Sequence, residues 1–291
     1  MTSGTGPAPQ RIRIELNDGA LAGFRWPAPD RPPLLFLHAT GFCACVYRRM
    51  LGGLKDRFDI YALDLRGHGL NTRPADPSRL RSWKPFVADA RAFLDRERRE
   101  GWTLAGHSMG AATSVLVAQG RTDVAALKLI EPVAMPGWMT FAAKTPFWPL
   151  MSNRIPLVRQ AARRRNRWPD RESVLASYAR KGLFKAWAPG VLEDYLEDGL
   201  VDDASGEGVR LSCDPRWESA TFAAQANDVW AAARAAPAKM SVFAADHPSS
   251  TVSSAARARF RRLGAELVVR PGVSHLAPME KPQDLAAFLG A

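Results

Sequence analysis

The nine residues Leu104–Ala112, LAGHSMGAA, constrain the fold more than any other part of the chain. An apolar run, Trp102–His107, leads into a lone serine, Ser108, and an alanine-rich apolar run follows at once. Glycines lie two residues before and two residues after this serine, at Gly106 and Gly110. A strand that turns directly into a helix folds so tightly that a side chain at either glycine would clash with neighbouring backbone. The spacing therefore predicts a strand–serine–helix turn that raises the Ser108 hydroxyl above the edge of a sheet.

Short apolar runs alternate with amphipathic stretches on both sides of this turn. Continuous apolar strands are typical of a parallel sheet that is covered by helices on both faces. Two runs joined by Asn-Asp-Gly near the start predict an opening hairpin, and residues 82–98 carry apolar side chains at helical spacing. We therefore expect an α/β fold with a mostly parallel sheet. The expected strands are Arg11–Leu16, Ala20–Trp26, Pro33–His38, Ile60–Leu65, Trp102–His107, Ala126–Glu131, Lys239–Asp246 and Ala265–Gly272.

The alternation stops between about Pro132 and Pro237. This stretch is rich in Trp, Pro, Arg and Ala and contains helical fragments without a convincing strand. Because the two flanking parts share one pattern, we predict a single core domain, residues 1–131 and 238–291, interrupted by a helical lid, residues 132–237. Aromatic side chains of the lid could wall an apolar pocket or form the lid's own small core. They are Trp138, Phe141, Phe147, Trp148, Phe184, Trp187, Trp217, Phe222 and Trp230.

The chain is strongly basic, with 40 Lys and Arg against 29 Asp and Glu and a formal net charge of +11. The densest basic stretch is Arg159–Arg171. It is compatible with an anionic partner such as nucleic acid or a membrane surface, or with a solvated helix face. No nucleic-acid recognition motif accompanies it. The sequence therefore favours the solvated face, and no nucleic acid is expected as a partner.

Composition also narrows the class of protein. No apolar run reaches the roughly 18 residues of a membrane helix, and the start of the chain lacks the apolar core of a secretory signal. We expect a cytoplasmic protein without a membrane span. The three cysteines, Cys43, Cys45 and Cys213, do not suit a disulfide framework. Neither they nor the five histidines form a pattern of metal ligands, and no metal or cofactor is expected.

One histidine and two carboxylates fit the chemistry of a serine nucleophile. His275 lies in the loop after the last expected strand, where its imidazole could take the proton of the Ser108 hydroxyl. An acid that orients this imidazole and stabilises its charged form completes such a site. Asp246 and Glu131 each end an expected strand at the same edge of the sheet. Asp246 is the preferred acid, and Glu131 is the alternative.

Backbone N–H groups are expected to hold the negative oxygen of a tetrahedral intermediate. One is that of Met109, which follows Ser108 at the start of the helix, where the helix dipole favours negative charge. The other comes from the turn after the third strand, from Thr40 or from Phe42. Loss of one such donor typically lowers the rate by about two to three powers of ten. His68 precedes the nucleophile in the chain, and we expect it to brace its loop by hydrogen bonds rather than to act as the base.

The motifs HATGF, DLRGHG, GHSMG, LIEP, the Asp246 loop and SHLAPMEKP, in this order, closely resemble the α/β-hydrolase fold. The resemblance covers most of the chain outside residues 132–237. It is to the lid-bearing branch that includes esterases, lactonases, epoxide hydrolases and haloalkane dehalogenases. It implies an eight-stranded sheet with the lid inserted after the sixth strand.

This sequence differs from parts of that branch in informative ways. Epoxide hydrolases and haloalkane dehalogenases carry an aspartate nucleophile where this chain has Ser108, which leaves acyl transfer to serine. The oxyanion turn reads His-Ala instead of the common His-Gly, and the loop AADHPSS lacks the usual glycine before its acid, Asp246. In some haloalkane dehalogenases the acid follows the sixth strand, where Glu131 stands.

These observations predict a cofactor-free serine hydrolase acting on a carboxylic ester or lactone through an acyl-enzyme on Ser108. The expected partner is a small molecule with an apolar portion. Three other fates of the acyl-serine remain open within the same chemistry: transfer to another acceptor, perhydrolysis and carbon–carbon bond cleavage. A protein of another class, a small-molecule receptor using the lidded pocket, is the remaining alternative.

Overall fold

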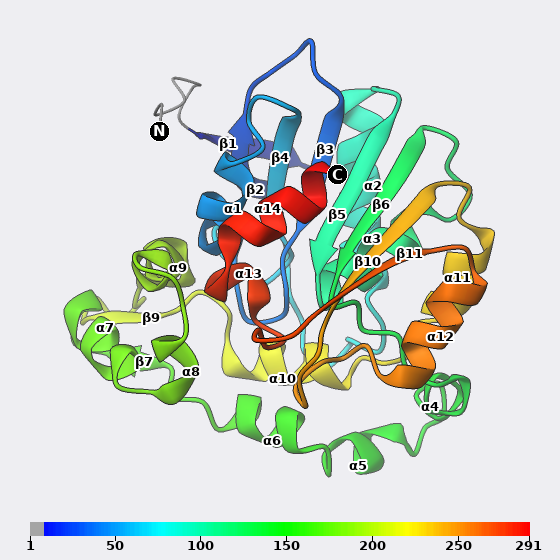
Figure 1. The fold of residues 1–291 in the computed structure, drawn as a ribbon. Helices are drawn as coiled ribbons and strands as arrows, with labels where there is room; N and C mark the ends of the chain where they lie inside the picture. The colour runs from blue at the N-terminus through cyan, green and yellow to red at the C-terminus, as the bar shows by residue number, and fades with distance from the viewer. Residues whose placement is uncertain (1–8) are drawn as a thin grey trace.

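Eight strands form one sheet through the centre of the molecule (Figure 1). The computed structural model describes residues 9–291. The strand order is β1-β2-β4-β3-β5-β6-β10-β11; the pairs β1–β2 and β2–β4 are antiparallel, and the pairs from β4 to β11 are parallel. The predicted mostly parallel eight-stranded sheet and its opening hairpin are confirmed. The strands are β1 (Gln10–Leu16), β2 (Gly19–Trp26), β3 (Pro33–Leu37), β4 (Asp59–Asp64), β5 (Trp102–His107), β6 (Val124–Ile130), β10 (Lys239–Ala245) and β11 (Glu266–Arg270).

Apolar clusters cover both faces of the sheet. Successive side chains of a strand point to opposite faces, and the central strands are apolar at successive positions. In β3, Leu35 and Leu37 belong to one cluster, which includes residues of α2, α3, α11 and α12. Leu34 and Phe36 belong to the other, which includes residues of α1 and α14. The helices that cover the sheet are α1 (Arg48–Gly52), α2 (Lys84–Glu97), α3 (Met109–Ala118), α11 (Val229–Ala235), α12 (Ser254–Arg262), α13 (Ala277–Glu280) and α14 (Pro282–Gly290).

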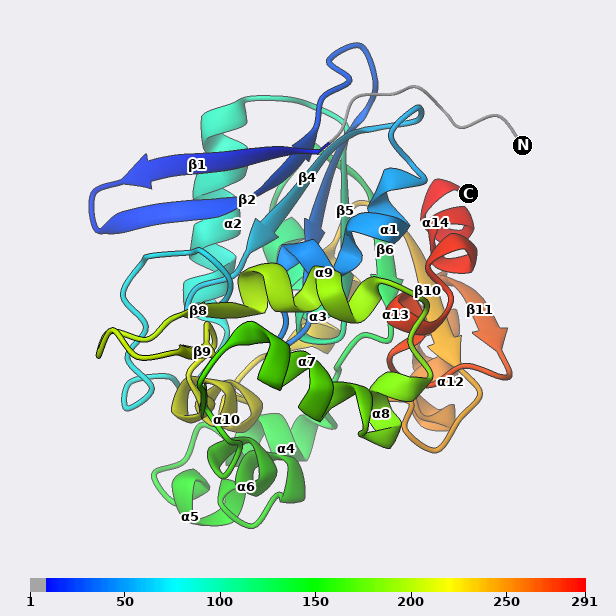
Figure 2. The same cartoon turned by 90° about the vertical axis from the view of Figure 1, so that its left-hand side faces the viewer.

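The chain between β6 and β10 contains mainly short helices, which lie outside the sheet (Figure 2). It also contains a small antiparallel sheet, β7-β9-β8, which the sequence analysis did not anticipate. These strands are two or three residues long, too short to show an alternating pattern. Besides α11, the elements are α4 (Gly137–Ala142), α5 (Trp148–Ser152), α6 (Pro156–Ala162), β7 (Arg167–Trp168), α7 (Arg171–Ala179), α8 (Gly182–Lys185), α9 (Val191–Gly199), β8 (Leu200–Asp202), β9 (Val209–Leu211) and α10 (Pro215–Ala223).

The inserted segment packs closely on the rest of the chain. Helix α9 contacts the 3₁₀ helix Ala44–Tyr47, and α11 packs on α3, although it lies within the predicted lid range. The division at residues 132 and 237 therefore stays a prediction. Within residues 9–291, no helix is both long enough and apolar enough to cross a membrane.

Candidate active site at the carboxyl edge of the sheet

Ser108 occupies a strained turn between β5 and α3, with φ 56° and ψ −116°. Such a positive φ is uncommon for a residue other than glycine and marks a position that the surrounding structure must enforce. A Cβ atom on Gly106 would lie 2.5 Å from the carbonyl carbon of Gly110, and one on Gly110 would lie 2.1 Å from the carbonyl oxygen of Leu37. The predicted reason for the two glycines, a close approach of backbone segments, is confirmed.

His275 lies between Ser108 and a carboxylate. It belongs to the loop between β11 and α13. Its Nε2 atom is 3.1 Å from Ser108 Oγ, and its Nδ1 atom is 3.0 Å from Oε2 of Glu131. The Ser108 hydroxyl is the group with a proton to give at Nε2, and Nδ1–H donates to the carboxylate, so this tautomer leaves Nε2 as an acceptor. Ser108, Glu131 and His275 follow the strands β5, β6 and β11, and their side chains thus meet at one edge of the sheet.

Glu131, not Asp246, is the carboxylate that faces His275. The Asp246 side chain is 63% exposed and pairs with Arg257 at 3.3 Å. The loop that follows β10 instead supplies hydrogen-bond donors to the other acid: Ser250 Oγ donates to Glu131 Oε1 at 2.8 Å, and Thr251 N–H donates to Oε2 at 2.8 Å. Asp246 was the preferred acid in the sequence-based prediction, but the carboxylate beside His275 is that of the alternative, Glu131.

The Glu131 carboxylate is fully buried and held by several donors. Besides the two from the β10 loop, Ala245 N–H donates to Oε1 at 2.6 Å. Burial alone would raise the pKa of Glu131, but the hydrogen bond and charge of His275 and the N–H groups of Ala245 and Thr251 outweigh it and lower the pKa below its usual value. The acid is thus held ionised beside the imidazole.

The turn after β3 leaves one backbone donor unused. Gly41 N–H donates to His68 Nε2 at 3.1 Å, and Phe42 N–H donates to the carbonyl of Ala39 at 3.2 Å. Among the hydrogen bonds of residues 9–291, none engages the N–H of Thr40 or of Met109. Of the two candidates in this turn, Thr40 therefore has a free N–H and Phe42 does not.

His68 makes the hydrogen bonds expected of a residue that braces its loop. Its Nε2 atom accepts from Gly41, and its Nδ1–H donates to the carbonyl of Arg66 at 3.0 Å. Burial lowers the pKa of His68 to about 4, so the ring stays neutral and keeps one donor and one acceptor.

A buried hydrogen-bond relay joins the Thr40 turn to the His275 loop, and the sequence analysis missed it. Ala39 N–H donates to Tyr47 Oη at 3.1 Å, Tyr47 Oη lies 2.8 Å from His107 Nδ1, and His107 Nε2 lies 2.8 Å from the carbonyl oxygen of His275. Since that carbonyl only accepts, Nε2 carries the proton. Burial lowers the pKa of His107 well below its usual value. The ring is therefore neutral, and its Nδ1 atom accepts a hydrogen bond from the Tyr47 hydroxyl. The one sequence signal was the place of His107 directly before Ser108.

The inserted segment reaches the same turn through Tyr195, whose hydroxyl donates to the Gly41 carbonyl at 3.1 Å. Arg164 in turn donates to Tyr195 Oη at 2.9 Å and pairs with Glu218 at 3.0 Å. Position 41 needs glycine for two reasons: its φ is +79°, and a Cβ atom there would lie 2.5 Å from Glu218 Oε1. The close packing of these groups fixes the outer side of the turn.

The lid aromatics are divided between interior and surface. Four of them are buried in the apolar clusters on the sheet: Phe184, Trp187, Trp217 and Trp230. Trp148 is buried outside these clusters, and Phe222 is half-buried. Three others, Trp138, Phe141 and Phe147, are exposed.

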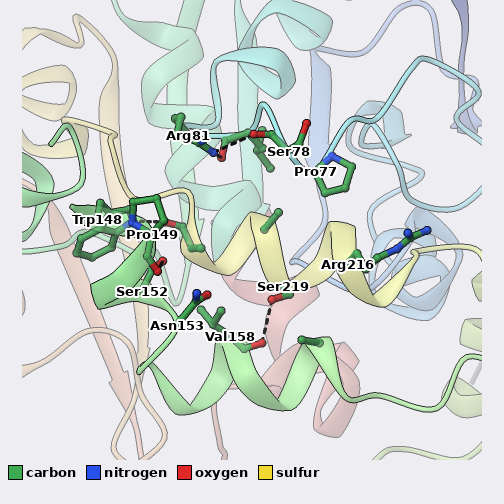
Figure 3. Close-up of a pocket in the computed structure, with 14 residues that line it drawn as sticks. Pro77, Ser78, Arg81, Trp148, Pro149, Ser152, Asn153, Val158, Arg216 and Ser219 are labelled. Carbon is green, nitrogen blue, oxygen red and sulfur yellow. Dashed lines mark hydrogen bonds between the residues drawn. The ribbon is translucent and has the colours of Figure 1, made fainter. Parts of the chain in front are cut away.

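A hollow of about 360 Å³ lies between α5, α6, α10 and the loop 77–81 (Figure 3). Its lining does not include Ser108, His275 or Glu131. In the part of the chain that the structure describes, no group of three or more His, Cys, Asp or Glu residues could hold a metal ion.

Comparisons with known proteins agree with this architecture. Residues 34–288 match the model of the "Alpha/beta hydrolase family". A 2-(acetamidomethylene)succinate hydrolase of Mesorhizobium japonicum is 35% identical over 94 residues, which are 32% of this chain and 32% of the relative. An N-formylmaleamate deformylase of Pseudomonas putida is 34% identical over 93 residues, 31% of this chain and 34% of the relative. The chain thus aligns with about a third of the length of these curated relatives.

The likeness in three dimensions extends over nearly the whole chain. The crystal structure of an E-2-(acetamidomethylene)succinate hydrolase superposes with a TM-score of 0.76 at 21% identity, covering 96% of this chain and 97% of that one. At this identity the match concerns the fold. Together with the family model, which spans most of the sequence, it leads to one conclusion: the chain belongs to the α/β-hydrolase family.

Proposed function

We propose that this chain is a serine hydrolase that cleaves a carboxylic ester or lactone through an acyl-enzyme on Ser108, without a cofactor. The observation that carries the proposal is the hydrogen-bonded series Ser108 Oγ, His275 and Glu131, with separations of 3.1 and 3.0 Å. A nucleophile beside a base that a buried acid orients is the arrangement that activates a hydroxyl at neutral pH.

In the proposed first half-reaction, Ser108 Oγ attacks the carbonyl carbon while His275 Nε2 takes the hydroxyl proton. The carbonyl oxygen becomes negative and is held by the N–H groups of Thr40 and Met109. His275 then gives its proton to the leaving alcohol as the carbon–oxygen bond breaks. Glu131 holds Nδ1–H and stabilises the imidazolium that exists between these two transfers.

In the second half-reaction, a water molecule loses a proton to His275 and attacks the acyl carbon. The new tetrahedral intermediate collapses, His275 returns the proton to Ser108 Oγ, and the carboxylic acid leaves. The names of the two curated relatives, a hydrolase of a succinate derivative and a deformylase of a maleamate, add small acids with a C–N bond to the substrates worth testing.

The proposal is tested by labelling with a fluorophosphonate, which reacts with an activated serine. We expect labelling of the wild-type chain, no labelling of Ser108→Ala, and no labelling of His275→Ala. Ser219→Ala, a serine in the hollow of Figure 3, should be labelled like the wild type. Labelling that survives in Ser108→Ala would refute the proposal, as would failure of the wild-type chain to label.

The same preparation then goes through a panel of p-nitrophenyl esters of increasing acyl length, lactones and N-formyl amides. Parallel reactions with an added alcohol distinguish hydrolysis from acyl transfer. A panel compound that raises the thermal unfolding temperature and is not turned over would favour the receptor function instead.

A further inference from the structure

Large apolar side chains project into solvent from three consecutive helices, α4, α5 and α6. Trp138 is 64% exposed, and Phe141 and Phe147 are each 73% exposed. We call this surface the α4–α6 face and define it by its exposed apolar residues. They are Trp138, Phe141, Phe147, Leu150, Met151 and Leu157. Figures 1 and 2 both place α4, α5 and α6 along one outer edge of the molecule, at the end opposite to Ala291.

The chain segment that forms this face carries charge of one sign. Residues 132–169 contain no Asp or Glu, and they contain seven Lys or Arg residues. Within the described chain, no ion pair involves five of these cations, all of which are exposed: Lys144, Arg154, Arg159, Arg163 and Arg165. Unpaired cations in the same short segment as exposed aromatic and aliphatic side chains are typical of a surface that meets both hydrocarbon and negative charge.

The hollow of Figure 3 adjoins the same helices. Its walls include Trp148 and Pro149 of α5 and Val158 of α6, together with Ala220 and Ala223 of α10. It is mostly apolar in residue type and offers about 360 Å³ next to the α4–α6 face. A recess of this kind beside a projecting apolar surface suits flexible hydrocarbon chains.

We infer that the α4–α6 face docks on an anionic lipid surface, with its aromatic residues among the headgroups and its cations on the lipid phosphates. Each Lys or Arg held near such a surface contributes to binding, and the aromatic and aliphatic side chains add apolar contact. A second copy of the chain is a poorer occupant, because a two-fold interface places a patch against itself and would bring the same cations together. This inference does not depend on the chemistry of Ser108.

The test is flotation of the full chain with vesicles in about 0.15 M salt. One set contains phosphatidylcholine with about 30% phosphatidylglycerol, and the other contains phosphatidylcholine alone. We expect binding to the anionic vesicles and much weaker binding to the neutral ones. Arg154→Gln/Arg159→Gln should weaken binding by about fivefold for each charge, or about 25-fold for the pair. Trp138→Ser/Phe141→Ser/Phe147→Ser should abolish flotation.

Two variants serve as matched controls, since they change the same residue types outside this face. Arg31→Gln/Arg96→Gln removes two exposed cations, and Leu183→Ser removes another exposed apolar side chain. Both should float like the wild type. Circular dichroism and thermal unfolding verify that each variant is folded.

Three results would overturn the inference. The first is absence of wild-type flotation with anionic vesicles, which would leave the face to a protein partner. The second is unchanged flotation of the folded aromatic variant or of the arginine variant. The third is a wild-type dimer in analytical ultracentrifugation that dissociates in the aromatic variant, which would assign the face to a second copy.

Discussion

The carboxyl edge of the sheet and the inserted segment differ in how fully their groups are engaged. At the edge, Glu131 accepts from four residues, and His68 and His107 each use both ring nitrogens. In helices α4 to α6 of the inserted segment, by contrast, Phe141 and Phe147 face solvent, and the exposed side chains of Lys144 and Arg154 form no ion pair with the described residues. At the sheet edge, hydrogen bonding and close packing therefore restrict which residues can stand at each position. In helices α4 to α6, several side chains are exposed and free to contact a partner.

The largest expected effect tests which carboxylate, that of Glu131 or that of Asp246, orients the His275 imidazole. Glu131→Gln keeps the size of the side chain and removes its charge, and we expect kcat/KM for the best ester of the panel to fall by about 10³–10⁴-fold. Asp246→Asn alters an exposed ion pair with Arg257, and its kcat/KM should stay within about twofold. Steady-state kinetics of both variants decide the point. Equal losses in the two would remove the distinction between the acids.

A glycine in each region tests how tightly the two are packed. Gly110→Ala at the edge puts a Cβ atom 2.1 Å from the Leu37 carbonyl oxygen, and backbone displacement of this kind costs about 1–3 kcal/mol or more. Gly137→Ala at the start of α4 meets nothing within 4 Å and should be neutral or stabilise by up to about 1 kcal/mol. Urea unfolding measures both. A stable Gly110→Ala chain would contradict the account of the serine turn.

The smallest expected effect is a difference in pH dependence. Burial raises the pKa of Asp64, at the end of β4, to about 7 although Ala44 and Leu70 donate to it. Its contribution to stability is therefore complete at acidic pH and is lost as the pH rises toward 7. In the inserted segment, the hydrogen bond from the N–H of Ser173 lowers the pKa of Asp170. The contribution of Asp170 to stability is therefore complete at neutral pH and is lost only as the pH falls below the ordinary pKa of an aspartate.

The measurement is the urea midpoint between about pH 5 and pH 8. The advantage of the wild type over Asp64→Asn should shrink as the pH rises, whereas the difference between the wild type and Asp170→Asn should stay constant over this range. A constant difference for Asp64→Asn would show that its carboxyl does not titrate there.

Much of the edge could be predicted from the sequence, because close contacts there exclude other residues. Gly106 and Gly110 have no space for a side chain, and this left a readable pattern around Ser108. The preference for Asp246 failed to identify the carboxylate beside His275, because the two acids follow neighbouring strands of the sheet and chain order does not separate them. The difference lies in the loop donors Ser250 and Thr251, which no pattern in the sequence connects to residue 131.

The inserted segment was harder to predict for the opposite reason. Its helices span only four to nine residues, and its strands two or three, so neither repeats an apolar pattern often enough to be recognised. Nothing in the order of residues distinguishes Trp148, which is buried, from Trp138, which is exposed. Burial in this segment depends on packing between distant elements, such as α6 against α10.

The relay from Ala39 through Tyr47 and His107 to the carbonyl of His275 has a mechanical consequence. Each of its links has a single donor and a single acceptor, so none can switch direction without leaving a buried polar group unpaired. The loop that carries the imidazole and the loop that carries the Thr40 amide are thereby linked through two buried side chains, Tyr47 and His107. A ligand that displaces either loop has to strain this series of hydrogen bonds, so the spacing between the base and the amide depends on how Tyr47 and His107 are packed between them.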